Sequence, residues 1–458
     1  MKRIFASLVL CLGVFMNFIP AFAELNFSGG GALRLRHEYW KNLKDMNNGV
    51  LDNRNFFRIK TSLWGQMDLD KKASLYVKLT DEFRAYTYFG GSTSSVPDKS
   101  ASKKGYHFDI NEVVFDNFYL DVKRVLDAPV GLRIGRQDLP ISDYGEGFLF
   151  GDGTPVDGSR TYYFNAAKAR WQIDGNTSLD AILIVDPRDE EFLPVINQTK
   201  LVNVSNPTLD KVTQQLNTTD EKAGVLYFRN KSIKNLYTEG YYIYKTEAGE
   251  GGTGLQSQRT RLHTFGSFSK FNFSPYTLRG QLAFQTGDYG DNSRRGLGGY
   301  VYIDRAFKNI PWSPLASLGY IYLSGDKQGT GTNEAWDPLF SRYPWLSDLY
   351  CLTLAGETGM TGYWTNFQWE RASLTLYPAK KAKLLLSYNF LRANTQVAAS
   401  SVFSGTSKTR GQLIQGRLDY EISKNITTYF TAEYLIPGKF YANQDEAVFL
   451  RTELTFKF

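Results

Sequence analysis

Charged side chains recur at alternate positions in several segments of this 458-residue sequence. Arg34 and Arg36 precede Glu38, and Arg58 precedes Lys60. Because alternate side chains point to the same face of a β-strand, each segment would present a row of charges on one side of a sheet. A series of weak cationic contacts suits the passage of anions, since tight binding at one point would stop transit. These rows are therefore candidates for a surface that attracts anionic solutes.

The end of the chain indicates which architecture would position such rows. The even positions from 448 to 458 carry Val, Leu, Thr, Leu, Phe and Phe, whereas Arg451, Glu453 and Lys457 fall on the opposite face. A terminal strand with an apolar outer face, a charged inner face and a final aromatic residue is typical of a bacterial outer-membrane β-barrel. A closed barrel satisfies its backbone hydrogen bonds within the ladders, so it needs no separate apolar core to hold the fold together.

Alternating runs bounded by turn residues predict about eighteen strands in a single all-β domain. The connections after even-numbered strands are mostly tight and those after odd-numbered strands are often long. This is the pattern of short periplasmic turns and long extracellular loops, and it places both chain termini in the periplasm. The predicted strands span residues 25–40, 54–68, 72–86, 108–122, 130–137, 162–173, 178–186, 222–230, 235–246, 259–271, 275–287, 294–304, 314–325, 363–378, 382–392, 409–422, 426–436 and 446–458.

The apolar positions of each strand determine which charges face the lumen. An arginine facing lipid near the midplane would cost about 2–4 kcal/mol, so we assign the charges to the inner face. The cations predicted to line the lumen are Arg34, Arg36, Arg58, Lys60, Lys78, Arg84, Arg133, Lys168, Arg170, Arg261, Arg279, Arg417 and Arg451. The same phase places Glu38, Trp64, Glu82, Asp180, Glu239, His263, Asp419, Glu421, Glu433 and Glu453 inside.

Two interpretations of this lumen remain open. In the first, cations and carboxylates pair across neighbouring strands, hold the barrel in shape and do not contact a solute. In the second, unpaired arginines near the first, second and last strands attract carboxylated or otherwise anionic solutes. The first strands and the sixth carry several cations and few acids, which favours a net positive lumen.

The beginning of the chain resembles a secretory signal peptide. Met1-Lys-Arg supplies positive charge, residues 4–19 are apolar, and Ala21-Phe-Ala23 is a small-x-small cleavage site. We therefore assign residues 1–23 to a signal peptide and residues 24–458 to an outer-membrane barrel. Removing Lys2 and Arg3 would lower the formal net charge from +7 to +5. The 29 tyrosines and 32 phenylalanines suit the aromatic girdles of such a barrel.

Other classes of function find less support in the sequence. His37, His107 and His263 are the only histidines, and none has a serine or carboxylate at catalytic spacing, so we expect no enzymatic activity. We also expect no cofactor and no metal centre, because histidines and cysteines do not cluster. The basic residues are spread along strands rather than gathered into a patch, which argues against nucleic acid as a partner. A general, structural or adhesive barrel with paired lumen charges remains the alternative.

Several short segments, in order along the chain, resemble the alginate export porin family. They are Phe57-Arg-Ile-Lys-Thr-Ser-Leu63, Leu132-Arg-Ile-Gly-Arg-Gln-Asp-Leu139, Asp157-Gly158, Ser324-Gly-Asp326, Trp336-Asp-Pro-Leu-Phe340, Ile436-Pro-Gly-Lys-Phe440 and Phe449-Leu-Arg-Thr-Glu-Leu454.

The resemblance implies an 18-stranded monomeric barrel with an arginine-rich lumen that passes anionic sugar polymers outward, in contact with outer-membrane lipid and periplasmic export partners. By motif position it implies pore-lining roles for Arg58, Arg133, Arg136 and Arg451. Strict alternation with Arg133 would point Arg136 the other way unless a bulge or the strand end redirects it. The chain also departs from the family, since no long periplasmic loop is evident, and the cargo is therefore left open between alginate and other acidic solutes.

Overall fold

A computed structural model describes residues 25–50, 53–86, 107–140, 142, 147–151, 164–194, 219–249, 258–327 and 329–458. The predicted signal peptide lies outside the described residues, and so does Asp157-Gly158 of the family-like segments.

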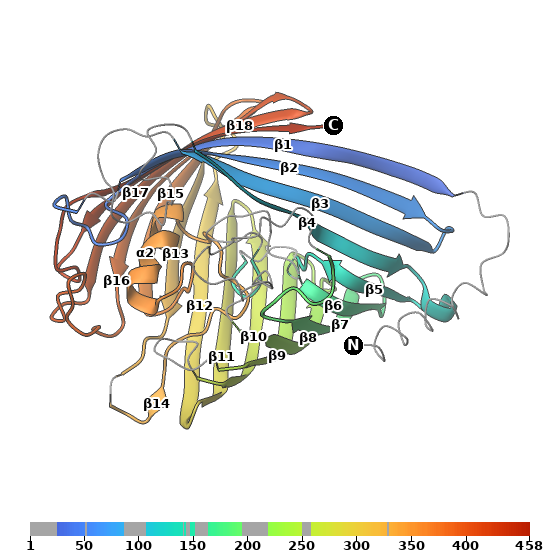
Figure 1. Ribbon diagram of the computed structural model, residues 1–458, viewed down its shortest axis with the longest axis horizontal. Helices are drawn as coiled ribbons and strands as arrows, with labels where there is room; N and C mark the ends of the chain where they lie inside the picture. The colour runs from blue at the N-terminus through green and yellow to red at the C-terminus, as the bar shows by residue number, and fades with distance from the viewer. Residues whose placement is uncertain are drawn as a thin grey trace, which may run out of the picture.

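Eighteen long strands and one short one form a single closed sheet, and every pairing between the long strands is antiparallel (Figure 1). The predicted strand edges agree with the observed ones to within four residues. The long strands are β1 (Asn26–Lys41), β2 (Arg54–Asp68), β3 (Ala73–Tyr86), β4 (His107–Val122), β5 (Val130–Gln137), β6 (Phe164–Gln172), β7 (Thr177–Asp186), β8 (Glu221–Asn230), β9 (Leu236–Glu247), β10 (Thr260–Phe273), β11 (Tyr276–Tyr289), β12 (Asn292–Ala306), β13 (Leu315–Leu323), β15 (Phe367–Ala379), β16 (Ala382–Arg392), β17 (Thr409–Ser423), β18 (Ile426–Pro437) and β19 (Ala447–Lys457).

The first and last strands close the barrel. β1 pairs with β2 on one side and with β19 on the other, and Glu38 lies opposite Arg451 in the second pairing. The two-residue strand β14 (Thr332–Asn333) runs parallel to β12 at the start of that strand. With no free edge on the long strands, the ladder hydrogen bonds hold the sheet without a disulfide.

Connection lengths differ between the two ends of the barrel as predicted. Turns as short as two residues follow β10, β15 and β17, and a single 3₁₀ turn, η1 (Val125–Asp127), lies between β4 and β5. The opposite end carries the long connections, the largest of them residues 324–366. One connection at that end is also tight, because Gly290 adopts a left-handed φ of 59° and only it and Asp291 separate β11 from β12.

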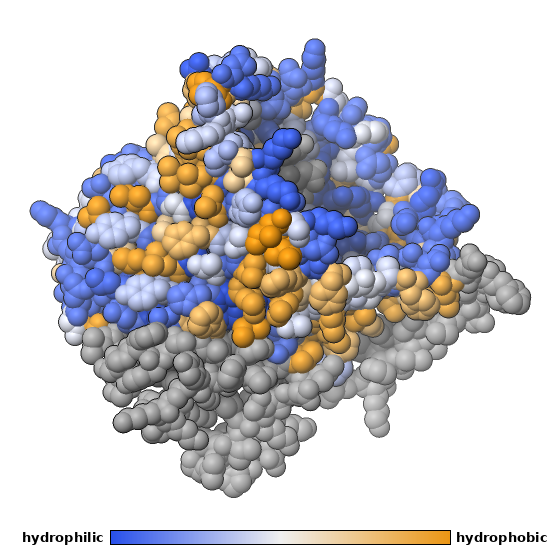
Figure 2. Space-filling model, turned by 90° about the horizontal axis from the view of Figure 1, so that it is seen from above, coloured by the Kyte–Doolittle hydropathy of each residue, from blue (hydrophilic) through white to orange (hydrophobic). Residues whose placement is uncertain are grey.

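The outer face of the strands is apolar and exposed. Leu183, Leu282 and Leu318 have exposed fractions of 66, 60 and 62 %. Such leucines alternate with buried residues along the same strands, which is the pattern expected where one face contacts lipid. Figure 2 shows one face of the molecule, on which apolar side chains gather between hydrophilic regions beside a hollow.

The interior contains an apolar body that the sequence did not predict. The 324–366 connection folds into the ring of strands and carries the helix α2 (Asp348–Thr358), which lies inside the barrel in Figure 1. Trp336, Phe340 and Trp364 of this connection are fully buried against wall residues such as Phe367. The barrel therefore contains an apolar core, although its ladders do not need one to close the sheet. In the described part of the chain, no helix is long and apolar enough to cross a membrane.

The apolar interior also inverts the predicted phase of one strand. On β10, Leu262 and Phe268 are fully buried in the apolar core of the interior, whereas Phe265 is 49 % exposed. Arg261 and His263 share the face of Phe265, so the prediction that they line the lumen is wrong. On β10, apolar side chains lie on the face toward the interior as well as on the face toward lipid. The sequence therefore shows no difference in polarity between the two faces, and the inward face cannot be identified from alternation.

Candidate functional site

Three arginines converge on one buried carboxylate where the barrel closes. Glu38 of β1 is fully buried, and its Oε1 accepts hydrogen bonds from Arg58 at 3.0 Å and from Arg451 at 2.8 Å. A guanidinium nitrogen of Arg36 lies 3.6 Å from the same oxygen. The register of β19, β1 and β2 places Arg451 and Arg58 on the two sides of Glu38, so pairing across strands creates the cluster.

Two further carboxylates complete this arrangement, which we call the seam cluster: Arg34, Arg36, Glu38, Arg58, Glu82, Arg451 and Glu453. Glu453 lies 2.7 Å from Arg36 and 3.9 Å from Arg34, and Glu82 lies 3.1 Å from Arg58 and also pairs with Arg34. Lys60, beside the cluster, has no carboxylate within ion-pair distance among the described residues. Cations therefore outnumber acids where the barrel closes.

The remaining predicted site residues are each paired with a carboxylate. The pairs are Arg133 with Asp121 at 2.5 Å, Arg136 with Glu190 at 2.8 Å, Arg170 with Asp180 at 2.7 Å, Arg279 with Asp304 at 3.0 Å and Arg417 with Asp419 at 2.7 Å. Pairing does not bury all of them, because the side chains of Arg133, Arg170 and Arg417 keep 35, 42 and 41 % exposure. These three can contact a solute while they remain paired.

Arg136 is enclosed at the end of β5. Its guanidinium donates to both carboxylate oxygens of Glu190, which belongs to the connection after β7, and to the carbonyl oxygen of Phe115. The preceding Gly135 adopts a φ of 127°, which interrupts regular strand geometry at this point. Arg136 therefore anchors a connection to the wall and is 2 % exposed.

Wall residues hold α2 at both of its ends. At the N-terminus, Glu433 of β18 accepts hydrogen bonds from the backbone N–H groups of Asp348 and Leu349 and from the Ser347 hydroxyl. Ser347 also caps the helix by accepting from the Tyr350 N–H. A carboxylate is favourable there because the helix dipole places partial positive charge at the N-terminus.

Ion pairs supplement these hydrogen bonds. Asp348 of α2 lies 2.7 Å from Arg451 of the seam cluster, and Glu357 near the other end of α2 lies 2.7 Å from Arg410 of β17. Elsewhere on the same connection, Asp337 lies 3.3 Å from Arg294 of β12. Carboxylates of the inserted connection therefore meet arginines of three different wall strands.

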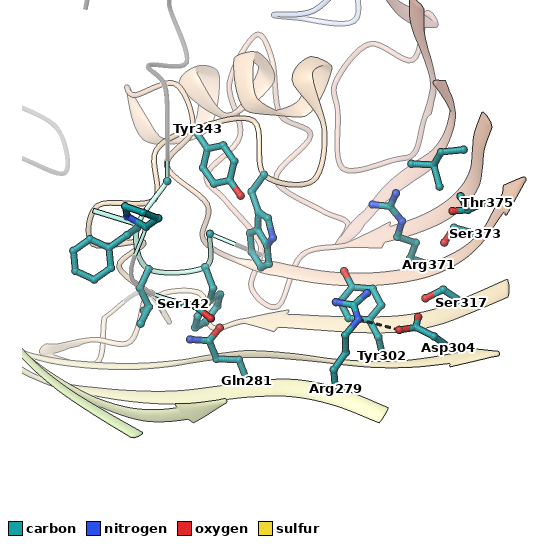
Figure 3. A pocket seen from close by; sticks show the side chains of 18 of the residues that line it. Ser142, Arg279, Gln281, Tyr302, Asp304, Ser317, Tyr343, Arg371, Ser373 and Thr375 are labelled. Carbon is teal, nitrogen blue, oxygen red and sulfur yellow. Dashed lines mark hydrogen bonds and ion pairs between the residues drawn. The ribbon is translucent and has the colours of Figure 1, made fainter. Parts of the chain in front are cut away.

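A cavity of about 940 Å³ lies on the inner side of β11–β16, toward the short-turn end of the barrel. Arg279, Tyr302 and Arg371 face it from neighbouring strands (Figure 3). The Arg279 guanidinium lies 4.2 Å from the centre of the Tyr302 ring and pairs with Asp304. Further lining comes from hydroxyl-bearing Ser142, Ser317, Tyr343, Ser373 and Thr375, from the ring of Trp345 and from the Lys383 side chain.

Of the three cations in the cavity, Arg279 was predicted, whereas Arg371 and Lys383 were missed from the sequence. Neither has a carboxylate within ion-pair distance in the described part of the chain. The signal was present: Leu374 and Leu386 are exposed on the outer face, and extending the alternation from them places both cations inside.

The lining of the cavity suits an anionic, hydroxylated solute. Guanidinium and ammonium groups bind carboxylates, and hydroxyls with aromatic faces can bind the ring and hydroxyl groups of a sugar. Within the described residues, no group of three or more histidine, cysteine, aspartate or glutamate side chains could hold a metal ion.

Comparisons with known proteins agree with this architecture. Barrels of similar fold include a BenF-like porin from Pseudomonas fluorescens Pf-5 (TM-score 0.58, 9 % identity, 96 % of this chain and 100 % of that one). Acinetobacter baumannii OccAB4 is similar as well (TM-score 0.57, 9 % identity, 94 % of this chain and 98 % of that one). Pseudomonas aeruginosa OpdK, solved with vanillate, is also similar (TM-score 0.54, 10 % identity, 96 % of this chain and 100 % of that one).

The sequence itself identifies the family. A comparison with curated proteins found no match. The family model described as alginate export matches residues 199–452, which is more than half of the chain. The closed sheet of antiparallel strands and the apolar outer face of this protein place it in the bacterial outer membrane, as a barrel of the porin type. The chain belongs to the alginate export family of outer-membrane channels.

Proposed function

We propose that the protein is a passive channel for anionic solutes, and that its cargo is an acidic oligosaccharide or polysaccharide. The observation that carries this proposal is the cavity at the periplasmic end of the lumen, in which Arg371 and Lys383 lack ion-pair partners among the described residues. Cations without a neighbouring carboxylate retain their full attraction for an incoming anion.

The balance of charge in the cavity supports the same conclusion. Arg279, Arg371 and Lys383 line it together with the acids Asp138 and Asp304. An excess of one positive charge gives attraction without the tight binding that would block transit. Paired arginines elsewhere that remain partly exposed would supply further weak contacts along the lumen.

The neutral part of the lining favours a sugar acid over a simple inorganic anion. Hydroxyls of Ser317, Ser373 and Thr375 lie along one side of the cavity, and Trp345 and Tyr302 supply aromatic surface. Pseudomonas aeruginosa OpdK, whose fold is similar, was solved with vanillate, itself a carboxylate. A passive channel sets no direction, so gradients and partners would decide between export and uptake.

Ion selectivity in a planar bilayer tests the proposal. Under a KCl gradient, the reversal potential of the wild-type channel should show preference for chloride over potassium. The double variant Arg371→Gln/Lys383→Gln should move the permeability ratio toward one. Arg392→Gln is the matched control, because Arg392 lies on the same strand as Lys383 but on the outer face, paired with Glu370 and 45 % exposed.

Two results would contradict the proposal. A cation-selective wild-type channel would show that the lumen does not attract anions. A barrel that inserts but carries no current would favour the alternative of a structural or adhesive barrel with paired charges.

A further inference from the structure

Basic side chains gather on the outer face of the barrel, next to its extracellular rim. Lys222 of β8, Arg261 of β10 and Arg295 of β12 are exposed there, and we call them the rim cations. In the described part of the chain, none of them has a carboxylate within ion-pair distance. Asp288 of β11 lies opposite Arg261 in the register and is also exposed, so three cations face one acid at this end of β8–β12.

The outward residues of β12 show how deep the rim cations lie. Arg295 and Arg305 are ten positions apart, or about 34 Å along the strand. Tilted strands convert this length to about 25 Å, which is the height of the apolar band of an outer-membrane barrel. Because β12 begins at the extracellular end, Arg295 lies at the outer surface of the membrane and Arg305 at the periplasmic surface. The outward residues between them are uncharged: Leu297, Gly299, Val301 and Ile303.

A histidine lies level with Arg295. His263 is opposite Thr286, which in turn is opposite Arg295. The Tyr242 hydroxyl lies 2.8 Å from Nδ1 of His263, and the ring centre of Tyr244 lies 4.7 Å from that of the imidazole. When the hydroxyl donates to Nδ1, Nε2 carries the hydrogen and can donate to an anionic oxygen.

A depression of about 360 Å³ lies on the same face, further toward the middle of the membrane. Small residues on β10, β11 and β12 form its floor, and tyrosines of β13 form one side: Ser267, Ser269, Gly280, Gly299, Tyr320 and Tyr322. Gly299 is four positions from Arg295, or about 14 Å along the strand. Phe284 and Leu297 are exposed between the two. An acyl chain attached to a group held by Arg295 would therefore cross apolar side chains and reach the depression.

We propose that this face of β8–β13 binds a phosphorylated glycolipid of the outer leaflet, with its phosphates on the rim cations and an acyl chain in the depression. Lipid A, the membrane anchor of lipopolysaccharide, has this chemistry, since its sugar headgroup carries phosphates at both ends. The inference concerns the lipid-facing surface, whereas the proposed function concerns the lumen. The strands that form the site lie side by side in the wall (Figure 1).

Charge complementarity favours this occupant over others. Guanidinium groups bind phosphate through paired hydrogen bonds. Arg261 lies two strands from Lys222 and two strands from Arg295, which is about 10 Å across the sheet in each direction, so the cations can contact separate phosphates of one headgroup. A zwitterionic phospholipid gains less, because its own ammonium group offsets its phosphate. A second copy of the chain docked through the same face would bring like charges together.

Native mass spectrometry of the detergent-solubilised barrel, titrated with lipid A, tests this inference. The wild type should bind lipid A more tightly than dephosphorylated lipid A. Arg261→Gln/Arg295→Gln should weaken lipid A binding about ten-fold, because charge-assisted hydrogen bonds are lost. Arg305→Gln/Arg392→Gln is the matched control and should bind as the wild type does. It also removes two outer-face cations, one at the periplasmic end and one paired with Glu370.

The depression has its own variant. Ser267→Trp fills it without changing charge, so lipid A binding should weaken while the preference for the phosphorylated form persists. Unchanged binding by Ser267→Trp would overturn the assignment of an acyl chain to the depression.

Three results would overturn the phosphate site. They are equal binding of lipid A by the cation variant and its control, equal binding of the two forms of lipid A by the wild type, and release of bound lipid A by an equal concentration of inorganic phosphate. The last result would indicate a site for free phosphate. Should the cation variant lack the heat-modifiable mobility of a folded barrel, the two wild-type measurements still decide.

Discussion

Replacing Glu38 by glutamine removes the charge on which three arginines converge. The substitution preserves size and leaves one amide oxygen as an acceptor, but the negative charge is lost. Arg58 and Arg451 lie 3.0 and 2.8 Å from the present carboxylate, which is fully buried. Their positive charges would then repel each other across an interior with little water.

The expected loss of stability follows from the contacts that remain. Removing one partner of a buried ion pair costs about 3–5 kcal/mol. Arg36, Arg58 and Arg451 each retain a second carboxylate, from Glu453, Glu82 and Asp348 respectively. We therefore expect the lower end of that range, about 3 kcal/mol, in the free energy of unfolding.

Urea unfolding of the barrel in lipid vesicles, followed by tryptophan fluorescence and extrapolated to zero denaturant, measures this quantity. Glu421→Gln is the matched control, because Glu421 also lies on an inner face but is 50 % exposed and 3.9 Å from Lys381. Exposed pairs contribute about 1 kcal/mol at most. Equal losses in the two variants, or a loss below about 1 kcal/mol for Glu38→Gln, would refute the idea that Glu38 holds the seam cluster together.

Three further predictions concern the connections and the backbone. Burial raises the pKa of the Cys351 thiol well above its usual range, so a maleimide should label it slowly in the folded barrel and quickly after unfolding, as mass spectrometry would show. Gly135→Ala should lower unfolding free energy by about 1–3 kcal/mol, because a Cβ would lie 2.2 Å from a neighbouring carbonyl oxygen at a φ of 127°, whereas Gly240→Ala has open space and should change it little. Arg136→Met should release the connection that Glu190 anchors, and limited proteolysis should then cut near residue 190 in the variant but not in the wild type.

The strands were predictable because the membrane imposes a simple pattern. Lipid demands an apolar outer face, and alternation then identifies inward residues such as Arg58 and Arg417 from their exposed neighbours. The same rule failed for Arg261 on β10, where the inner face is apolar as well. It failed there because apolar side chains fill the interior beside β10, and the sequence of a strand does not reveal what its inner face will contact.

The inserted connection and the ion pairs were beyond sequence reasoning for a different reason. Residues 324–366 show no sustained periodicity, and α2 depends on contacts with Glu433 and Arg410, which are distant in sequence. Whether an arginine is paired depends on register between strands, as for Arg451 and Glu38. Alternation alone places a charge on a face, but its partner is set by the fold. The inward position of Arg371, by contrast, can be predicted from sequence, because alternation from the outward-facing leucine of β15 places it on the inner face.

The seam cluster should affect the rate at which the barrel unfolds. Its contacts join residues 417 positions apart for Arg36 and Glu453, and 413 positions apart for Arg451 and Glu38. Contacts between the two ends of a chain form only after the intervening strands have assembled, because closing so long a loop is entropically costly. Interactions formed after the transition state slow unfolding more than they speed folding. We therefore expect the ion pairs of these arginines to form late in folding and to slow unfolding, which lengthens the lifetime of the folded barrel in the membrane.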